Sequence, residues 1–270
     1  MATFDELTNE AFQIKMNAVK RLVSVLLGDF KSMEPEVIRK LMDLGFSDGK
    51  IKSTKSRAET VRQILNVIES VVGGPVVDSA VRGMFTSIDE INLINAQIHQ
   101  QLNSISDISA VVGRNRADII RKVSESMFGV EYRNNFVLPL QKGLTQRVMT
   151  GIGFNQLESY LAQQMGNSPW VRFAAFNAVQ QYDGAINEAI ADEFKLNAYR
   201  YVGSLIEDSR PQCRRWVGKE VIKREDLNSE LEWARMNGSG IVPATNEINF
   251  ARFRGGYNCR HQAYPIRIDE

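Results

Sequence analysis

The chain contains 270 residues, of which 43% are hydrophobic and 24% are charged, as in ordinary globular proteins. Its 33 Lys and Arg residues balance 32 Asp and Glu residues, which excludes a bulk nucleic-acid coat because phosphate binding needs concentrated positive charge. Two cysteines exclude a disulfide-framework protein, and we expect a chain that is kept in a reducing compartment.

The first helix is predicted over residues 4–27, because apolar side chains recur there at spacings of three and four. Gly28 is its predicted end, since glycine favours the left-handed conformation that closes a helix. A second helix is predicted to begin at Pro35, because proline is tolerated in a first turn. Residues 46–55 are mostly polar and are predicted to form a loop.

The N-terminal segment lacks the features of a targeting sequence. Asp5 and Glu6 stand where a secretory signal carries positive charge, so no signal is expected. The longest apolar runs, such as residues 22–27, are far shorter than the ~20 residues that a membrane-spanning helix needs. We therefore expect a soluble protein.

Two further helices follow. Ser56 and Glu59 form an S-x-x-E capping pattern before a helix that is predicted to end at residues 73–75, a Gly-Gly-Pro sequence. Residues 77–105 are predicted to form one long helix, whose apolar positions follow a near-heptad seam. This seam is predicted to be helix–helix core, with binding of a neighbouring subunit as the alternative.

Four more helices are predicted, over residues 116–128, 134–150, 155–165 and 168–196. They are separated by residues that favour turns, namely Gly129, Gly151, Gly153, Gly166 and Asn167.

The sequence changes character near Leu196. Residues 199–206 are aromatic and β-branched, which is typical of a strand, and residues 264–268 are predicted to form a terminal strand. Between them we predict a helical turn over residues 213–217 and a short helix that begins at Asp226 as its cap and ends at residue 236. The predicted fold is mainly α, with a long helical N-terminal region (1–196) followed by a small α+β C-terminal domain (197–270).

Candidate site residues gather in two segments of the C-terminal domain, residues 208–216 (DSRPQCRRW) and 254–261 (RGGYNCRH). One hypothesis is a zinc site, because Cys213, Cys259 and His261 supply three ligands of the types that zinc prefers. The spacing is atypical, since 45 residues separate the cysteines and the close pair is C-x-H. Asp208 is a candidate fourth ligand.

A second hypothesis is nucleophilic catalysis by a cysteine that a histidine activates. Cys259 and His261 are two residues apart, but the sequence indicates no third group that would orient the histidine and no oxyanion hole.

The third hypothesis is structural, and it is the one that we favour. The cysteines are buried as small apolar residues, with a disulfide between them as a variant that would form only in an oxidising medium. Gly255 and Gly256 allow a tight turn. Arginines and carboxylates bind one another in a polar network that joins the two loops, formed by Asp208, Arg210, Arg214, Arg260 and His261.

The two segments also carry a family resemblance. The stretch YVGSLIEDSRPQCRRWVGK and, about forty residues later, RGGYNCRHQAYPI resemble the C-terminal domain of phage head morphogenesis proteins, the minor head proteins of the Mu protein F-like group. The resemblance covers residues 197–270, a quarter of the chain. The matching motif residues are Asp208, Ser209, Arg210, Cys213, Arg214, Gly255, Gly256, Asn258, Cys259, Arg260 and His261.

The resemblance implies a low-copy virion protein that is made in the host cytoplasm and lies inside the capsid at the portal vertex. It implies a role in head assembly and, in some members, passage with DNA on ejection. The implied partners are the portal protein, around which the chain would be multimeric, then major capsid or scaffold proteins and packaged DNA, without a membrane. It implies no enzymatic activity, no cofactor and a structural or binding role for the motif. The alternative is a Cys/His-dependent or zinc-binding enzyme.

Overall fold

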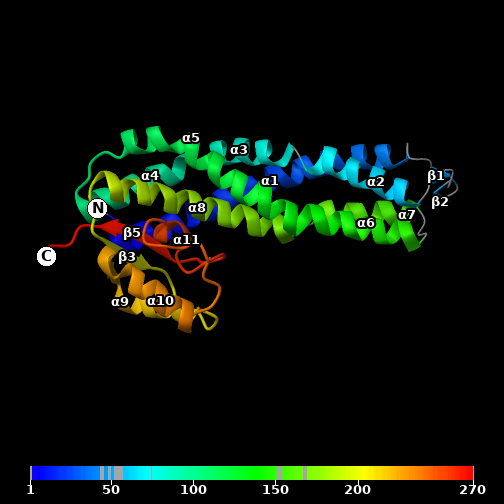
Figure 1. Ribbon diagram of the computed structural model, residues 1–270. Helices are drawn as coiled ribbons and strands as arrows, with labels where there is room; N and C mark the ends of the chain where they lie inside the picture. Colours follow the sequence, from blue (N-terminus) through cyan, green and yellow to red (C-terminus); the bar gives the residue numbers. More distant parts are fainter. Residues whose placement is uncertain are drawn as a thin grey trace. The chain divides into compact units, whose positions relative to one another are not determined.

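The computed structural model describes residues 2–42, 46–47, 50–51, 57–73, 75–150, 154–166 and 169–269. The chain divides into two compact units, each of which is assembled from segments that are distant in sequence. Unit 1 comprises Met1–Ala18, Ile88–Val123 and Phe176–Glu270, and unit 2 comprises Val19–Ser87 and Ser124–Ala175. The prediction of a mainly α fold with a small β-containing C-terminal region is confirmed (Figure 1).

The first 193 residues are almost entirely helical where they are described. The elements in chain order are α1 (Phe4–Met42), β1 (Phe46–Ser47), β2 (Lys50–Ile51), α2 (Arg57–Ile68), α3 (Pro75–Ser87), α4 (Asp89–Asn103), α5 (Ser109–Glu125), α6 (Leu138–Thr150), α7 (Phe154–Gly166) and α8 (Pro169–Glu193). Three π-helical turns join or extend them, η1 (Glu69–Gly73), η2 (Ser126–Val130) and η3 (Arg133–Val137).

Helix α1 does not end at Gly28, and no new helix begins at Pro35, so these two predictions were wrong. Both residues lie inside one helix of 39 residues. A glycine costs about 1 kcal/mol and an interior proline about 3 kcal/mol in a helix. Burial of each large apolar side chain returns about 1.5–3 kcal/mol, and Leu26, Phe30 and Val37 are all buried along this stretch. Tertiary packing therefore overrides the two local stop signals.

The long helix predicted over residues 77–105 is interrupted at Ile88, between α3 and α4. Ile88 has φ −108° and ψ −4°, and α4 ends at Ser104 in the left-handed conformation. The seam is core over most of its length, as predicted, but Phe85 is 38% exposed. Its buried members are Met84, Ile88, Ile91, Ile94 and Ile98. These side chains are consequently not available to a neighbouring subunit.

Gly129 also fails to end a helix. The backbone stays helical from Ser109 to Thr150 through η2 and η3. This continuity keeps Tyr132 and Phe136 stacked on Phe30, with ring centroids 5.9 and 5.2 Å away. π-Helical turns accommodate an extra residue within a helix, which lets these aromatic side chains reach one core.

Part of the predicted loop over residues 46–55 is described, and there β1 pairs with β2 in antiparallel register. The capping residue Ser56, Gly74 of the predicted helix end, and Gly151, Gly153 and Asn167 lie outside the described residues.

One stretch, Val61–Ser87, is long and apolar enough by composition to cross a membrane, contrary to the expectation from run length. About half of it is buried within the protein. It is divided between two helices, and Ile64, Ile68 and Val76 are fully buried in unit 2. We therefore assign this stretch to the core of unit 2.

Unit 1 contains a three-stranded antiparallel sheet in the order β4-β3-β5. The strands are β3 (Ala198–Val202), β4 (Val221–Lys223) and β5 (Gln262–Ile266). The strand predicted over 199–206 stops at Val202, because Gly203 has φ +140°. The terminal strand was predicted two residues late, and β4 was not predicted because three residues show no periodicity.

Helices α9 (Pro211–Lys219), α10 (Leu227–Asn237) and α11 (Phe250–Phe253), with the 3-10 turn η4 (Arg224–Asp226), complete this region. Figure 1 shows α9 and α10 side by side, and α9 contacts strands β3 and β4. The core between them is built around Tyr201, Trp216 and Phe250, whose rings contact one another. Asp226 stands at the start of α10 as predicted, but its side chain makes no capping hydrogen bond.

Strand β5 is buried at every position, because helices of unit 1 cover it as well. Tyr264 packs with Leu7 of α1 and with Ile94 and Ile98 of α4. The strand thus shares one core with α1 and α4, and the predicted boundary between 196 and 197 stays a prediction.

Candidate functional site

The first motif segment forms a turn that leads into α9. Ser209 accepts a hydrogen bond through Oγ from the Ile206 amide and donates its own amide to the Ile206 carbonyl. Arg214 closes the turn, since its guanidinium donates to the carbonyls of Ser209, Ile206 and Glu207 at 2.6–3.0 Å. The segment is therefore shaped by one arginine that binds the backbone.

Arg210 joins the two motif segments. Its guanidinium donates to the carbonyls of Gly255 and Tyr257, the latter at 2.8 Å. Gln212 adds a second link, since its side-chain amide donates to the carbonyls of Ser239 and Gly255. Segments 45 residues apart are thus fixed by side chains that bind backbone oxygens.

Both motif glycines are required by close approach. A Cβ on Gly255 would lie 2.4 Å from Cys213 Sγ and 2.9 Å from Cys259 Sγ. Gly256 has φ +100°, and a Cβ there would lie 1.9 Å from the Gly240 carbonyl oxygen. The tight turn that the sequence predicts therefore lets the backbone at Gly255 pass directly over the two sulfurs.

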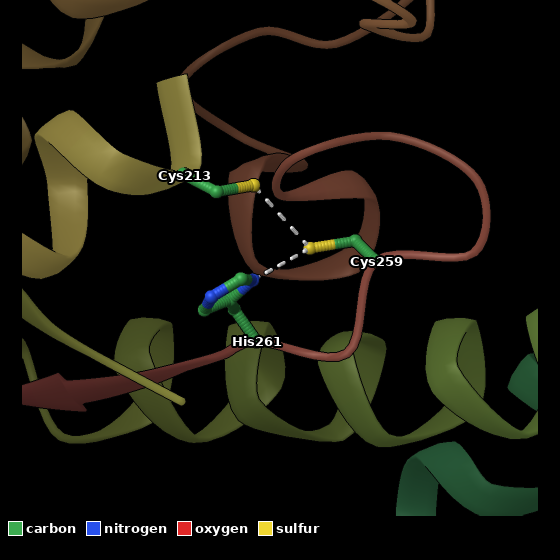
Figure 2. A group of neighbouring side chains, drawn as sticks. All are labelled: Cys213, Cys259 and His261. Atoms are coloured by element: carbon green, nitrogen blue, oxygen red, sulfur yellow. Dashed lines mark hydrogen bonds between the residues drawn. The ribbon is translucent and has the colours of Figure 1, made fainter. Parts of the chain in front are cut away.

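Cys213, Cys259 and His261 come together (Figure 2). Cys213 extends from α9, Cys259 from the loop after α11, and His261 from the residue before β5. The two Sγ atoms are 3.9 Å apart, and Cys259 Sγ is 3.6 Å from His261 Nδ1. Their ligand atoms all lie within 4.8 Å of one another. Both cysteines are free thiols and buried.

Tyr201 of β3 completes the cluster. Its hydroxyl lies 3.7 Å from Cys213 Sγ and 3.6 Å from Cys259 Sγ, and its ring stacks on His261 with centroids 5.6 Å apart. Burial raises the pKa of Tyr201 well above its usual range, so the hydroxyl stays protonated and is a donor to sulfur. Sequence analysis missed this residue, because a tyrosine in a strand is by itself typical of core.

The two buried sulfurs are hydrogen-bonded to each other at 3.9 Å. The hydrogen bond with Cys213 lowers the pKa of Cys259 well below its usual range, and the nearby His261 and Arg254 lower it further. The same hydrogen bond, with burial, raises the pKa of Cys213.

The predicted arginine–carboxylate network is not formed. Arg210 and Arg214 bind carbonyl oxygens, while Asp208 and Arg260 are both exposed. Within the described part of the chain no ion pair involves Asp208 or Arg260. The arginines bind backbone carbonyls and not carboxylates, because the turn brings several carbonyls within reach of one guanidinium. The motif residue Asn258, with φ +59°, contacts α8, since its backbone amide donates a hydrogen bond to Asn177 Oδ1.

A cavity of about 710 Å³ adjoins the cluster within unit 1. Cys213, Cys259 and His261 all line it, together with residues of α1 and the exposed Asp208. Nε2 of His261 is buried and has no hydrogen-bond partner among the described residues. The cluster is therefore buried and also reachable from one side.

A buried ionic network on α1 and α8 contacts β5 at Gln262, the residue after His261, and no sequence pattern indicated it. Lys15 Nζ lies 2.7 Å from Asp183 Oδ2 and donates to Gln262 of β5, and both charged side chains are at most 1% exposed. Burial would raise the pKa of Asp183, but the charges of Lys15 and Arg254 outweigh it and lower the pKa. Lys15 lies in an apolar stripe of α1, where the sequence gives no signal of a distant partner.

No family model, curated protein or solved structure matches the chain, so the geometry of this cluster is the observation on which a function rests.

Proposed function

We propose that the chain is a phage minor head protein, a low-copy virion component that acts in head assembly at the portal vertex and has no enzymatic activity. One observation carries the proposal. The D-S-R-x-x-C-R and G-G-x-N-C-R-H segments, on which the resemblance rests, are joined through Arg210 and through Cys213 and Cys259. Two segments that lie 45 residues apart in the sequence thus form one folded element.

The roles of the motif residues support a structural interpretation. Arg214 holds a turn, Arg210 holds the opposite loop, and Gly255 allows the loop to approach the sulfurs. Each of these roles stabilises the local fold of the two segments. The proposed partners are the portal protein first, then major capsid or scaffold proteins and packaged DNA, with several copies around the portal.

Quantitative mass spectrometry of purified phage particles tests this function. The expected result is a few to a few tens of copies per particle. Loss of the chain after triggered DNA release would show that it is ejected with the genome, and retention would show a fixed portal-vertex component. Absence from particles would contradict the proposal.

A variant sharpens the same experiment. Arg210→Lys keeps the charge but loses the planar fork that binds two carbonyls at once, so we expect fewer copies per particle. Lys223→Arg, at an exposed ion pair on β4, is the matched control and is expected to leave the copy number unchanged. Equal incorporation of both variants would show that the joined motif is not needed for assembly.

A Cys/His-dependent or zinc-binding enzyme is the second candidate, because the cluster faces a cavity. Nucleophilic catalysis is disfavoured by His261, whose Nε2 contacts no orienting group among the described residues. Turnover of a substrate that requires Cys259 would favour this candidate over the assembly role.

A further inference from the structure

We propose that Cys213, Cys259 and His261 form a binding site for a divalent cation of the zinc class, with a fourth coordination position open to the adjoining cavity. The site goes beyond the assembly role and does not depend on it. Particles that lack the chain would refute the assembly role and leave metal binding untouched.

The distances between the three side chains fit a tetrahedral site. Zn–S bonds of about 2.3 Å and Zn–N bonds of about 2.0–2.1 Å place tetrahedral ligands about 3.8 Å apart for two sulfurs and about 3.6 Å apart for sulfur and nitrogen. The Sγ atoms of Cys213 and Cys259 are 3.9 Å apart, and Cys259 Sγ is 3.6 Å from His261 Nδ1.

The third distance, between Cys213 Sγ and the ligand nitrogen of His261, needs only a small movement to fit a tetrahedral site. The ligand atoms of Cys213 and His261 are at most 4.8 Å apart. Metal binding therefore requires these two side chains to approach by about 1 Å, a shift that side-chain rotation supplies.

The direction of approach also fits. The Gly255 backbone covers the two sulfurs on one side, where a Cβ would already collide with Cys213. The cavity of about 710 Å³ reaches all three side chains from another side. A cation would enter from the cavity, and water would occupy its fourth position, as in zinc sites with three protein ligands.

The donor set selects the ion. Two thiolates and one imidazole suit Zn²⁺ and its close analogues, whereas Mg²⁺ and Ca²⁺ require oxygen ligands. A dication that displaces the thiol protons to solvent forms a neutral centre with two thiolates, which suits side chains that are only 2% and 7% exposed. A simple disulfide is a poorer fit, because a bond requires the sulfurs to approach from 3.9 Å to about 2.05 Å beneath the Gly255 backbone.

The test is a titration of the reduced full-length chain with Co²⁺, because the visible absorption spectrum of bound Co²⁺ reports its coordination geometry. We expect saturation at one Co²⁺ per chain, with the visible bands of tetrahedral cobalt and a near-ultraviolet thiolate-to-cobalt band. Addition of Zn²⁺ should remove both bands and raise the melting temperature. Failure of the reduced chain to bind Co²⁺ at this stoichiometry would overturn the proposal.

Variants locate the bound ion. Cys213→Ser, Cys259→Ser and His261→Asn should each abolish or greatly weaken the bands, with circular dichroism confirming that the variants are folded. Ser204→Ala is the matched control, because Ser204 is exposed and lines the same cavity without contributing a ligand. Bands that persist in both cysteine variants would place the ion elsewhere and overturn the assignment. If a variant fails to fold, protection of both wild-type thiols from alkylation by Zn²⁺ decides the question, since unprotected thiols would also overturn it.

Discussion

Glu230 holds α9 and α10 together with one buried carboxylate. Arg215 donates to both of its oxygens at 2.8 and 3.0 Å, and Trp216 Nε1 and Lys219 Nζ donate as well. The hydrogen bonds from Arg215 are the main reason that the pKa of Glu230 falls to about 2. The carboxylate therefore stays charged in the folded protein down to strongly acidic pH.

We predict that Glu230→Gln lowers the free energy of unfolding by about 2–3 kcal/mol at neutral pH, because charged hydrogen bonds between α9 and α10 are lost. Urea denaturation measures the change. Glu225→Gln is the control, since its pair with Lys223 is exposed and is worth less than about 0.5 kcal/mol. The difference between the two variants should vanish as the pH falls from about 4.5 towards 2, because Glu230 then becomes protonated in both states.

His99 of α4 gives a second pH dependence within unit 1. Its Nε2 lies 2.8 Å from Asn187 Oδ1 and its Nδ1 lies 3.1 Å from Asn103 Nδ2, so a neutral ring satisfies both neighbours. Burial lowers the pKa of His99 to about 4. The unfolded chain therefore binds a proton between about pH 6.5 and pH 4 that the folded chain does not.

We predict that the wild-type protein loses about 2 kcal/mol of stability between pH 7 and pH 5 relative to His99→Gln, since only the wild type has this histidine to protonate on unfolding. Urea denaturation at the two pH values measures the difference. Parallel stability curves for the two proteins would show that His99 is not neutral in the folded state.

At the scale of elements, the close crossing of α8 and α11 depends on one glycine. A Cβ on Gly184 would lie 2.2 Å from the Ala251 carbonyl oxygen and 2.5 Å from Arg252 Cα. Both neighbouring atoms belong to backbone and have no rotamer with which to move away. The crossing also brings Glu188 of α8 to the Arg252 amide, which it accepts at 2.8 Å.

We predict that Gly184→Ala destabilises the protein by about 1–3 kcal/mol, although alanine is the better helix former, because the two elements must separate. Gly113→Ala in α5 is the matched control. Nothing lies within 4 Å of its Cβ position, so it should stabilise by about 0.5–1 kcal/mol. Thermal melting of the two variants should move in opposite directions, and a shift in the same direction would contradict the crossing.

Element boundaries show where local signals fail. Gly28, Pro35 and Gly129 are helix breakers by local preference, yet each lies inside a helix. Ile88 is a good core residue with no breaker beside it, yet α3 ends there. Local preferences are worth about 1–3 kcal/mol at a position, and burial of several neighbouring apolar side chains exceeds that.

At the scale of the whole molecule, residues 197–270 do not bury their own sheet, because helices α1, α4 and α8 also cover it. Tyr264 is fully buried against α1 and α4, and Arg254 donates to the Gln180 carbonyl and side chain on α8. A segment that begins at residue 197 lacks all of these partners. It would expose an apolar face and leave a buried arginine without its acceptors.

We predict that the isolated fragment 197–270 shows no cooperative thermal transition, because β5 needs α1, α4 and α8 to be covered. Circular dichroism during heating tests this, with the full chain as the control. Addition of fragment 1–196 should restore protection of backbone amides in β5 from hydrogen exchange. A sharp melting transition of 197–270 alone would show that it is an independent domain.

The sequence alone determined the helical character of the first 193 residues, the change to mixed structure after Leu196, and the two segments that carry the candidate site. These features depend on local periodicity and composition, which act over a few turns of chain. Only the tertiary structure decided that Cys213 meets Cys259 beneath Gly255, that Arg210 binds carbonyls and not Asp208, and that Lys15 is buried against Asp183. Those contacts join residues 45 to 168 positions apart. Each forms only where distant segments supply partners that offset the cost of desolvating polar groups, and no local pattern specifies those partners.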